Sequence, residues 1–375
     1  MLRLKDLTGL IPVEFPTTRL IDASPQHRAQ DINSAFADPD IKAVLATIGG
    51  TDQITVIPHL DAQLIHDNPK IFIGYSDNTN LHNWLWQQGI TSFYGGSTQV
   101  QLGPGPFVDA IHADSLRAAL ITGGELELTN PGESEDFGVD WAESAALTNF
   151  GEREVAEPWT WIGPEKTVRG RTWGGCIQVL TQLALADLLP ALEDLQDTIV
   201  LLESSEEIPT DLELTMTVRA LGERGLFNIV RGIMVARPPV IDFTFRPDVD
   251  ARRRLRDKHR DIVLEQIARY TDDAVVCFGV PFGHTRPQWI VPHGGYITLD
   301  GRAQRVFADY SWLGVSVLCD YTESVECAGI SDQWQKLDDC LDEERAVIPH
   351  VEVAVDVTTQ LRFAPTHGHQ HHQRE

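Results

Sequence analysis

Continuously apolar runs alternate with segments of helical periodicity in the N-terminal part of the chain. Residues 42–48 (KAVLATI) and 71–73 (IFI) are short apolar runs, which are typical of strands buried on both faces. The spacing of apolar residues predicts helices over 27–36, near 57–65 and over 77–88. Because strands and helices alternate, the pattern favours βαβ units and a parallel sheet, whose ligand-binding loops lie at the carboxyl ends of the strands.

A second set of elements occupies the later part of the chain. The pattern predicts a helix over 176–187 and buried strands over 198–202 and 274–280. Two short antiparallel strands are predicted over 296–300 and 304–307. The second set therefore indicates another α/β domain, in which some strands are antiparallel.

The segment between these sets has no clear periodicity and is rich in glycine, proline and tryptophan. We therefore expect four parts: an N-terminal domain over 1–150, a linker over 151–170, a C-terminal domain over 171–319 and an acidic extension over 320–375. Within the extension, alternating valines from Val351 to Val357 predict a half-buried strand. An amphipathic helix is predicted over 334–341, before that strand.

The chain is strongly acidic. Its 375 residues include 30 Lys and Arg against 55 Asp and Glu, a net charge of −25. Such a surface repels phosphate backbones and anionic lipids, which argues against nucleic-acid or membrane binding as the main role. No apolar run is long enough to span a bilayer, and no leader sequence is recognisable. The five cysteines form no C-x-x-C pair, which indicates reduced thiols in a cytoplasmic protein.

Ser76 lies at a sharp predicted turn between a strand and a helix. This is the geometry of a nucleophile elbow, which exposes the hydroxyl beside the free N–H groups of the helix N-terminus. We expect Asp77 to cap that helix. The Gly49-Gly50 pair, after the preceding strand, can approach a ligand closely and present backbone N–H groups. The alternative is an ordinary turn serine, because the elbow pattern has a second glycine where this chain has Asn78.

Ser76, Glu203 and His284 all lie just after the ends of predicted strands. A serine hydroxyl is a weak nucleophile near neutral pH, so it needs a histidine base, and an acid must orient and stabilise that base. The order Ser, acid, His therefore suits a hydrolase. Taken singly, Glu203 is equally consistent with a solvated residue after its strand, and His284 with a hydrogen-bonded loop residue.

Five long motifs make the sequence similar to one family of serine peptidases, which contains the LD-carboxypeptidases and the microcin C immunity peptidases. The resemblance covers about residues 5–318 and rests on motifs in a fixed order. These are 28–50 (RAQDINSAFADPDIKAVLATIGG), 68–85 (NPKIFIGYSDNTNLHNWL) with Tyr94-Gly95, 170–180 (GRTWGGCIQVL), 201–207 (LLESSEE) and 279–285 (GVPFGHT).

The resemblance implies an α/β fold with a Rossmann-like parallel-sheet domain at the N-terminus, a β-rich α/β domain at the C-terminus, and an active site between them. The family's catalytic residues match Ser76, Glu203 and His284, and its oxyanion-hole N–H groups match Gly50 and Asp77. The resemblance implies no metal or organic cofactor and commonly a homodimer. The implied reaction is acyl transfer, in which His284 takes the Ser76 proton and later protonates the leaving amine.

Two branches of the family differ in substrate. One hydrolyses the bond between L-Lys or diaminopimelate and D-Ala in murein tetrapeptides, and the other cleaves the amide between an amino acid and a modified nucleotide, as in processed microcin C. The motifs here are closer to the immunity branch. Trp159, Trp161 or Trp173 are candidates to stack on a nucleobase, with core packing as the alternative. Gly49 is a further substrate-binding candidate.

The chain departs from the family pattern before its first motif and after Asp320. The family begins with a βα unit that carries the first strand of the sheet, and no counterpart is found here. Either the start lies further upstream, or that strand is absent and the sheet exposes an edge. Two rival functions stay open: a catalytically silent peptide- or nucleotide-binding protein on the same fold, and a metal-dependent amidase using His284 and His293. No H-x-x-E-H spacing supports the amidase.

Overall fold

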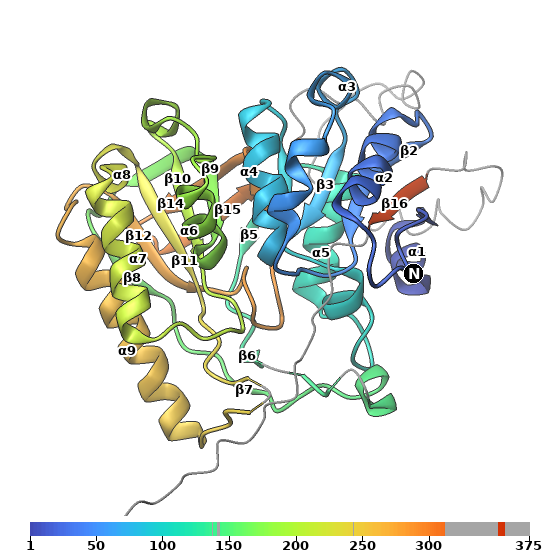
Figure 1. The fold of residues 1–375 in the computed structure, drawn as a ribbon. Coiled ribbons are helices and arrows are strands. Elements are labelled where there is room, and N and C mark those ends of the chain that lie inside the picture. Colours follow the sequence, from blue (N-terminus) through green and yellow to red (C-terminus); the bar gives the residue numbers. More distant parts are fainter. Residues whose placement is uncertain (137, 141–142, 243, 312–351, 357–375) are drawn as a thin grey trace, which may run out of the picture.

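The computed structural model describes residues 1–136, 138–140, 143–242, 244–311 and the strand 352–356. In Figure 1 these residues form two adjoining α/β lobes, one built mainly from the first part of the chain and the other mainly from the later part. The α-helices of the described residues are α1 (Leu2–Thr8), α2 (Pro25–Ala37), α3 (Ala62–Asp67), α4 (Thr79–Gln87), α5 (Ala110–Arg117), α6 (Ile177–Leu185), α7 (Asp211–Glu223), α8 (Leu226–Ile229) and α9 (Val249–Ile267).

The N-terminal lobe contains a six-stranded sheet, parallel except at one edge. In spatial order its strands are β1 (Ile11–Glu14), β16 (Glu352–Asp356), β2 (Ile41–Ala46), β3 (Ile71–Gly74), β4 (Ser92–Tyr94) and β13 (Val291–His293). Only β13 runs antiparallel to its neighbour, β4. The strands β2 and β3 are almost wholly buried, as their continuous apolar runs predicted. This parallel sheet confirms the expected N-terminal fold.

The strand β16 lies inside this sheet, although it comes from the C-terminal extension. It pairs in parallel with β1 on one side and with β2 on the other. The alternating valines predicted a strand here, and the structure confirms it, but the pattern gave no indication of its partners. The sequence left open whether the family's first strand is absent, in which case we expected the sheet to expose an edge. Within the described residues β16 joins β1 to β2, and β1 and β13 are the edge strands of this sheet. The helix predicted over 334–341 lies outside those residues.

The C-terminal lobe contains an eight-stranded mixed sheet. In spatial order its strands are β5 (Glu125–Leu128), β15 (Arg305–Asp309), β14 (Tyr296–Asp300), β9 (Thr167–Cys176), β10 (Ile199–Glu203), β11 (Gly232–Ala236), β12 (Val275–Val280) and β8 (Thr160–Ile162). The run from β9 to β12 is parallel, and the flanking strands are antiparallel. The predicted antiparallel pair is β14 and β15. The mixed sheet confirms the expected β-rich α/β domain.

The two sheets take strands from across the domain boundaries expected from the sequence. The strand β5 lies before residue 150 but pairs with β15, and β13 lies after residue 171 but pairs with β4. The segment 151–170, expected as a linker, contains β8 and the start of β9. A further short pair, β6 (Glu133–Ser134) and β7 (Glu154–Val155), forms a separate two-stranded sheet. Glycine and proline content indicates where strands are interrupted, but it does not determine with which sheet each strand pairs.

The lobes meet where α4 packs against β9 and α6. Gly175 of β9 makes this approach possible, because it has φ +133° and a Cβ there would lie 2.7 Å from Thr79 Oγ1. The Thr79 hydroxyl accepts a hydrogen bond of 3.1 Å from the Cys176 amide. The first residue of α4 is therefore fixed against the C-terminal lobe.

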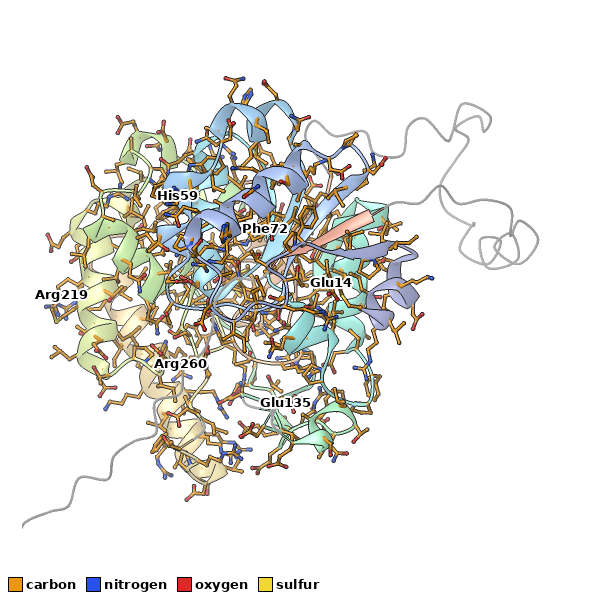
Figure 2. The ribbon with its side chains drawn as sticks, turned by 45° about the vertical axis from the view of Figure 1, so that its right-hand side comes forward. Glu14, His59, Phe72, Glu135, Arg219 and Arg260 are labelled. Carbon is orange, nitrogen blue, oxygen red and sulfur yellow. The ribbon has the colours of Figure 1, made fainter. Side chains whose placement is uncertain are left out.

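Helices α7 and α9 pack against each other over the C-terminal sheet. Figure 2 shows Arg219 of α7 at the outer edge of the lobe, whereas Phe72 of β3 lies in the interior, where it is fully buried. This arrangement leaves the carboxyl ends of β3, β4, β10 and β12 near the junction of the lobes, where the predicted site residues lie.

Candidate active site

Ser76 occupies a strained turn. The strand β3 ends at Gly74, and a single 3₁₀ turn over Ser76–Asn78 leads into α4. Ser76 has φ +65°, in the left-handed region, which costs a non-glycine residue on the order of 1–3 kcal/mol. The geometry is the predicted strand–turn–helix elbow. Because strain of this kind persists only where the surroundings impose it, it marks Ser76 as a candidate functional residue.

Gly49 lies directly against this serine. A Cβ at position 49 would lie 2.7 Å from Ser76 Cβ and 2.8 Å from Ser76 Oγ, closer than packed atoms allow. It would also lie 3.7 Å from the Asp77 amide nitrogen. Gly49 and Gly50 both line the cleft that contains Ser76. Position 49 therefore requires glycine, because the backbone there lies directly against Ser76.

The Asp77 side chain fixes the loop that follows the glycine pair. Its carboxylate accepts a hydrogen bond of 2.8 Å from the Gln53 amide and one of 2.9 Å from Asn80 Nδ2. We expected a capping bond to the backbone of α4, and this expectation is wrong: the helix has no side-chain cap. Burial raises the pKa of Asp77 to about 6. The carboxylate thus holds two loops together, which leaves the Asp77 backbone as the candidate part of an oxyanion hole.

Glu203 and His284 form a close hydrogen-bonded pair. Glu203 is the last residue of β10 and is buried, and His284 follows the end of β12. The distance from His284 Nδ1 to Glu203 Oε2 is 2.6 Å. Because an ionised carboxylate only accepts hydrogen bonds, the proton of this bond lies on Nδ1. The structure therefore brings together the acid and the base that the sequence placed on two strand ends.

Tyr94 connects this pair to the serine turn. Its hydroxyl donates a hydrogen bond of 2.6 Å to Glu203 Oε1 and accepts one of 3.2 Å from the Ser76 amide. From the sequence, Tyr94 was recognised only as part of a family motif, with no role of its own. A signal was present, because Tyr94 ends β4, the strand beside β3, and the carboxyl ends of neighbouring parallel strands meet at one edge of a sheet.

A second carboxylate contacts His284 from the cleft. Glu206 Oε2 lies 3.0 Å from His284 Nε2, so the imidazole is held between two carboxylates. Although burial alone would lower it, the negative charges of Glu203 and Glu206 raise the pKa of His284 to about 10. Burial would likewise raise the pKa of Glu206, but the positive charge of His284 lowers it to about 2. Two flanking carboxylates therefore favour the charged form of the imidazole.

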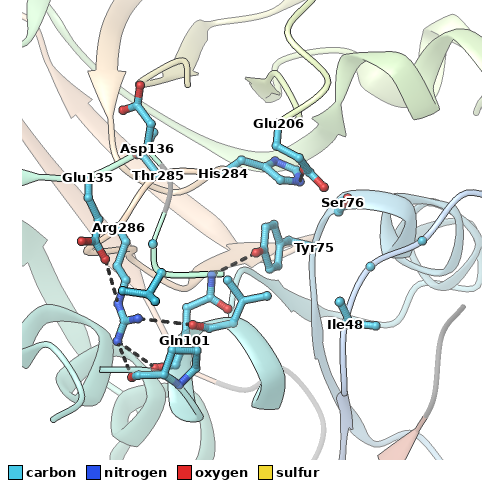
Figure 3. A pocket seen from close by; sticks show the side chains of 16 residues that line it. Ile48, Tyr75, Ser76, Gln101, Glu135, Asp136, Glu206, His284, Thr285 and Arg286 are labelled. Carbon is cyan, nitrogen blue, oxygen red and sulfur yellow. Dashed lines mark hydrogen bonds and ion pairs between the residues drawn. The ribbon is translucent and has the colours of Figure 1, made fainter. Parts of the chain in front are cut away.

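The sequence reasoning gave no role to Glu206 either, although Glu206 stands three residues after Glu203 in the same motif. Glu206 contacts Nε2 of His284, the ring nitrogen that is not hydrogen-bonded to Glu203. Within the described residues no hydrogen bond joins Ser76 Oγ to His284, and Figure 3 shows Glu206 beside the imidazole with Ser76 close to both. Ser76, His284 and Glu206 thus line one cleft, and Glu203 lies buried behind the imidazole.

The cleft itself lies between the lobes and has an empty volume of about 890 Å³ that opens to solvent. Its lining includes Gly49, Gly50, Tyr75, Ser76, Gln101, Glu135, Asp136, Glu206, His284 and Arg286. Figure 3 shows Ser76, Glu206 and His284 on one side and the paired Arg286 and Glu135 on the other. The mixed polar and apolar lining suits a small substrate.

The three candidate tryptophans do not line this cleft. Trp173 is completely buried, and its indole N–H donates a hydrogen bond of 3.2 Å to Asn83 Oδ1. Its ring therefore has no face open to a nucleobase, which corrects that expectation. Trp159 and Trp161 are partly buried and pack against the core. A tryptophan side chain buries a large area on folding, and packing is the role that all three side chains have here.

No metal site is apparent in the part of the chain that the structure describes. His293, proposed with His284 for a metal-dependent amidase, is fully buried, and its Nε2 lies 3.3 Å from the Gly174 carbonyl oxygen. No group of three or more His, Cys, Asp or Glu side chains among the described residues is placed to hold an ion.

The described helices include none with the length and apolar character needed to cross a membrane.

Comparison with known proteins identifies the family. A model described as the LD-carboxypeptidase N-terminal domain matches residues 3–95, and one described as the LD-carboxypeptidase C-terminal domain matches residues 169–299. The chain belongs to the LD-carboxypeptidase family. The resemblance inferred from the motifs is thereby confirmed.

Relatives from two branches resemble this LD-carboxypeptidase family member. The microcin C7 self-immunity protein of Escherichia coli is 26% identical over 278 residues, which cover 73% of this chain and 76% of that protein. A "probable murein peptide carboxypeptidase" of Bacillus subtilis is 26% identical over 274 residues, which cover 71% of each chain. A crystal structure of an MccF-like protein from Streptococcus pneumoniae, in complex with AMP, has a TM-score of 0.71 and 26% identity, and covers 82% of this chain and 91% of its own.

Proposed function

We propose that this protein is a serine hydrolase that cleaves an amide bond, with Ser76 as nucleophile, His284 as base and Glu203 as the acid that orients it. The observation that carries the proposal is the 2.6 Å bond from His284 Nδ1 to buried Glu203, in the same cleft as the strained Ser76. With its proton held on Nδ1, the imidazole directs Nε2 toward the cleft, as a triad requires.

The reaction follows from this arrangement once Glu206 has left Nε2. His284 takes the proton of Ser76 as the hydroxyl oxygen forms a bond to the amide carbon. The backbone N–H groups of Gly50 and Asp77 hold the negative oxygen of the tetrahedral intermediate. His284 then protonates the leaving amine as the C–N bond breaks, and it deprotonates the water that releases the acyl group.

Two substrate classes are consistent with the relatives. The Bacillus subtilis relative is described as acting on murein peptides, whereas the Escherichia coli relative confers self-immunity to microcin C7 and the Streptococcus pneumoniae structure holds AMP. We propose a murein tetrapeptide or an aminoacyl-nucleotide as the substrate. The alternative is a catalytically silent protein that binds such a ligand on the same fold.

The test compares the wild type with Ser76→Ala on a murein tetrapeptide and on aspartyl sulfamoyl adenosine, with products measured by mass spectrometry. We expect the wild type to cleave at least one of them and the variant to lose about a thousandfold in kcat/KM with an unchanged melting temperature. Equal turnover by both proteins contradicts the serine mechanism, and binding without cleavage supports the silent protein. Turnover that is unchanged in EDTA excludes a required metal ion.

Two expectations from the sequence stay predictions. One is a homodimer, which the family resemblance implies and which light scattering of the purified protein measures. The other is a cytoplasmic location, which the cysteine pattern indicates and which fractionation of the producing cells measures. We propose both on these grounds alone.

A further inference from the structure

Glu206 differs from Glu203 in its exposure to the cleft. The side chain of Glu203 has 0% of its surface exposed, whereas that of Glu206 has 37% exposed. Both carboxylates contact the same imidazole, one at each ring nitrogen. His284 therefore contacts one fully buried carboxylate, that of Glu203, and one partly exposed carboxylate, that of Glu206, which a ligand can reach.

The other charged groups of the cleft are already paired with protein partners. Arg286 Nε lies 3.1 Å from Asp109 and 3.8 Å from Glu135. Asp136 is held by two buried arginines of the C-terminal lobe, at its Oδ1 and Oδ2. Among the described charged residues of the cleft lining, Glu206 differs in having the imidazole as its ion-pair partner.

This contact has a consequence for the proposed mechanism. Nε2 is the nitrogen that must accept the proton of Ser76, and the carboxylate of Glu206 occupies it. A carboxylate 3.0 Å from Nε2 favours a proton on that nitrogen as well as on Nδ1, and a ring protonated on both nitrogens cannot act as a base. Glu206 must move before the reaction begins, and an isolated carboxylate in a partly buried site needs another cation.

We propose that Glu206 binds a primary ammonium group of the substrate close to the scissile amide, and that this contact frees His284 for Ser76. The inference rests on the serine mechanism proposed above. It adds the requirement that the acyl part of the substrate carries an ammonium group. Both candidate substrates carry such a group: the side chain of L-Lys or diaminopimelate in the tetrapeptide, and the free α-amine of an aminoacyl-nucleotide.

The proton balance of this exchange is simple. The substrate ammonium replaces the imidazolium as partner of the Glu206 carboxylate, and His284 Nε2 loses its proton to solvent. The neutral ring keeps its Nδ1 proton on Glu203. Among the described residues, the titratable or charged groups of this cleft also include Tyr75, whose ring centroid lies 4.8 Å from that of the imidazole, and the paired side chains of Arg286, Glu135 and Asp136. Burial raises the pKa of Tyr75, so the phenol stays neutral.

The first test uses a neutral fluorophosphonate, which labels an activated serine and carries no ammonium. Near pH 7 we expect Glu206→Gln to be labelled at Ser76 about tenfold faster than the wild type, because one less carboxylate faces the imidazole. Glu207→Gln is the matched control, because Glu207 is the exposed neighbour of Glu206 and is not paired with the His284 imidazole. This variant should keep the wild-type labelling rate. Equal rates for Glu206→Gln and the wild type overturn the inference. No labelling in any variant overturns the serine mechanism itself.

The second test measures the preference for a cation. Each substrate is compared with its N-acetylated form: the tetrapeptide with Nε-acetyl-lysine, and aspartyl sulfamoyl adenosine with an acetylated α-amine. For whichever is cleaved, we expect acetylation to lower kcat/KM of the wild type and of Glu207→Gln about tenfold or more, and that of Glu206→Gln less than about threefold. The same ratio in all three proteins overturns the inference while leaving the serine mechanism intact.

Discussion

The hydroxyl of Tyr94 donates a 2.6 Å hydrogen bond to Glu203 across the boundary between the two sheets. Tyr94 ends β4 of the N-terminal sheet, and Glu203 ends β10 of the C-terminal sheet. The same hydroxyl accepts the amide proton of Ser76. One side chain therefore fixes the acid and the nucleophile turn relative to each other, although the two come from different lobes.

We expect Tyr94→Phe to lower both activity and stability. It leaves a buried oxygen of Glu203 without one of its donors, which costs about 1–3 kcal/mol of unfolding free energy. It also loosens the Ser76 turn, so kcat should fall about tenfold. Urea denaturation and steady-state kinetics measure the two effects.

The matched control for this variant is Tyr310→Phe. Tyr310 is equally buried, and its hydroxyl donates to the Ile290 carbonyl oxygen outside the cleft. The control should lose a similar amount of stability and keep its kcat. A wild-type kcat in Tyr94→Phe would show that the hydroxyl does not position the site.

Gly49→Ala should lower the activity strongly without unfolding the protein. The added methyl would lie 2.8 Å from Ser76 Oγ, so the hydroxyl must move from its position over the turn. We expect kcat/KM to fall about a hundredfold. The rate of fluorophosphonate labelling at Ser76 measures the same loss without a substrate, and the melting temperature reports on the fold. Normal labelling would contradict this account of the glycine.

Asp136→Asn should destabilise the protein strongly. The buried carboxylate pairs with Arg237 and Arg256 and accepts a hydrogen bond of 2.8 Å from the Val240 amide. The neutral side chain leaves two buried guanidinium groups short of a counter-charge, which costs about 3 kcal/mol. Urea denaturation measures the change. Lys166→Met, which breaks an exposed pair with Asp273, should cost less than about 1 kcal/mol.

Stability should fall as the pH rises above neutral. The pKa of His284 is raised to about 10 in the folded protein, against about 6.5 for a histidine in an unfolded chain. The folded state binds the extra proton, so this stabilisation is full below about pH 6.5 and is lost as the pH rises toward about 10. Urea denaturation over this range should give a smaller loss in Glu206→Gln, because only Glu203 then holds the charge. Identical slopes would contradict the contact between Glu206 and His284.

Local patterns in the sequence were sufficient for much of the fold and for the candidate triad. Apolar runs predicted β2, β3, β10 and β12 because strands buried on both faces need apolar residues throughout. Ser76, Glu203 and His284 were found because polar residues that interrupt such runs stand at strand ends. These signals are local, so they can be recognised without knowing which elements pack against one another.

Only the tertiary structure decided which of these residues meet and what else meets them. The valines of β16 predicted a strand, but its place between β1 and β2 depends on pairing with residues some three hundred positions away. The contacts of Tyr94 with Glu203 and of Glu206 with His284, and the burial of Trp173, likewise depend on how the lobes pack. Sequence periodicity records which face of an element is apolar. It does not record which distant group that face, or the polar residue at its end, will contact.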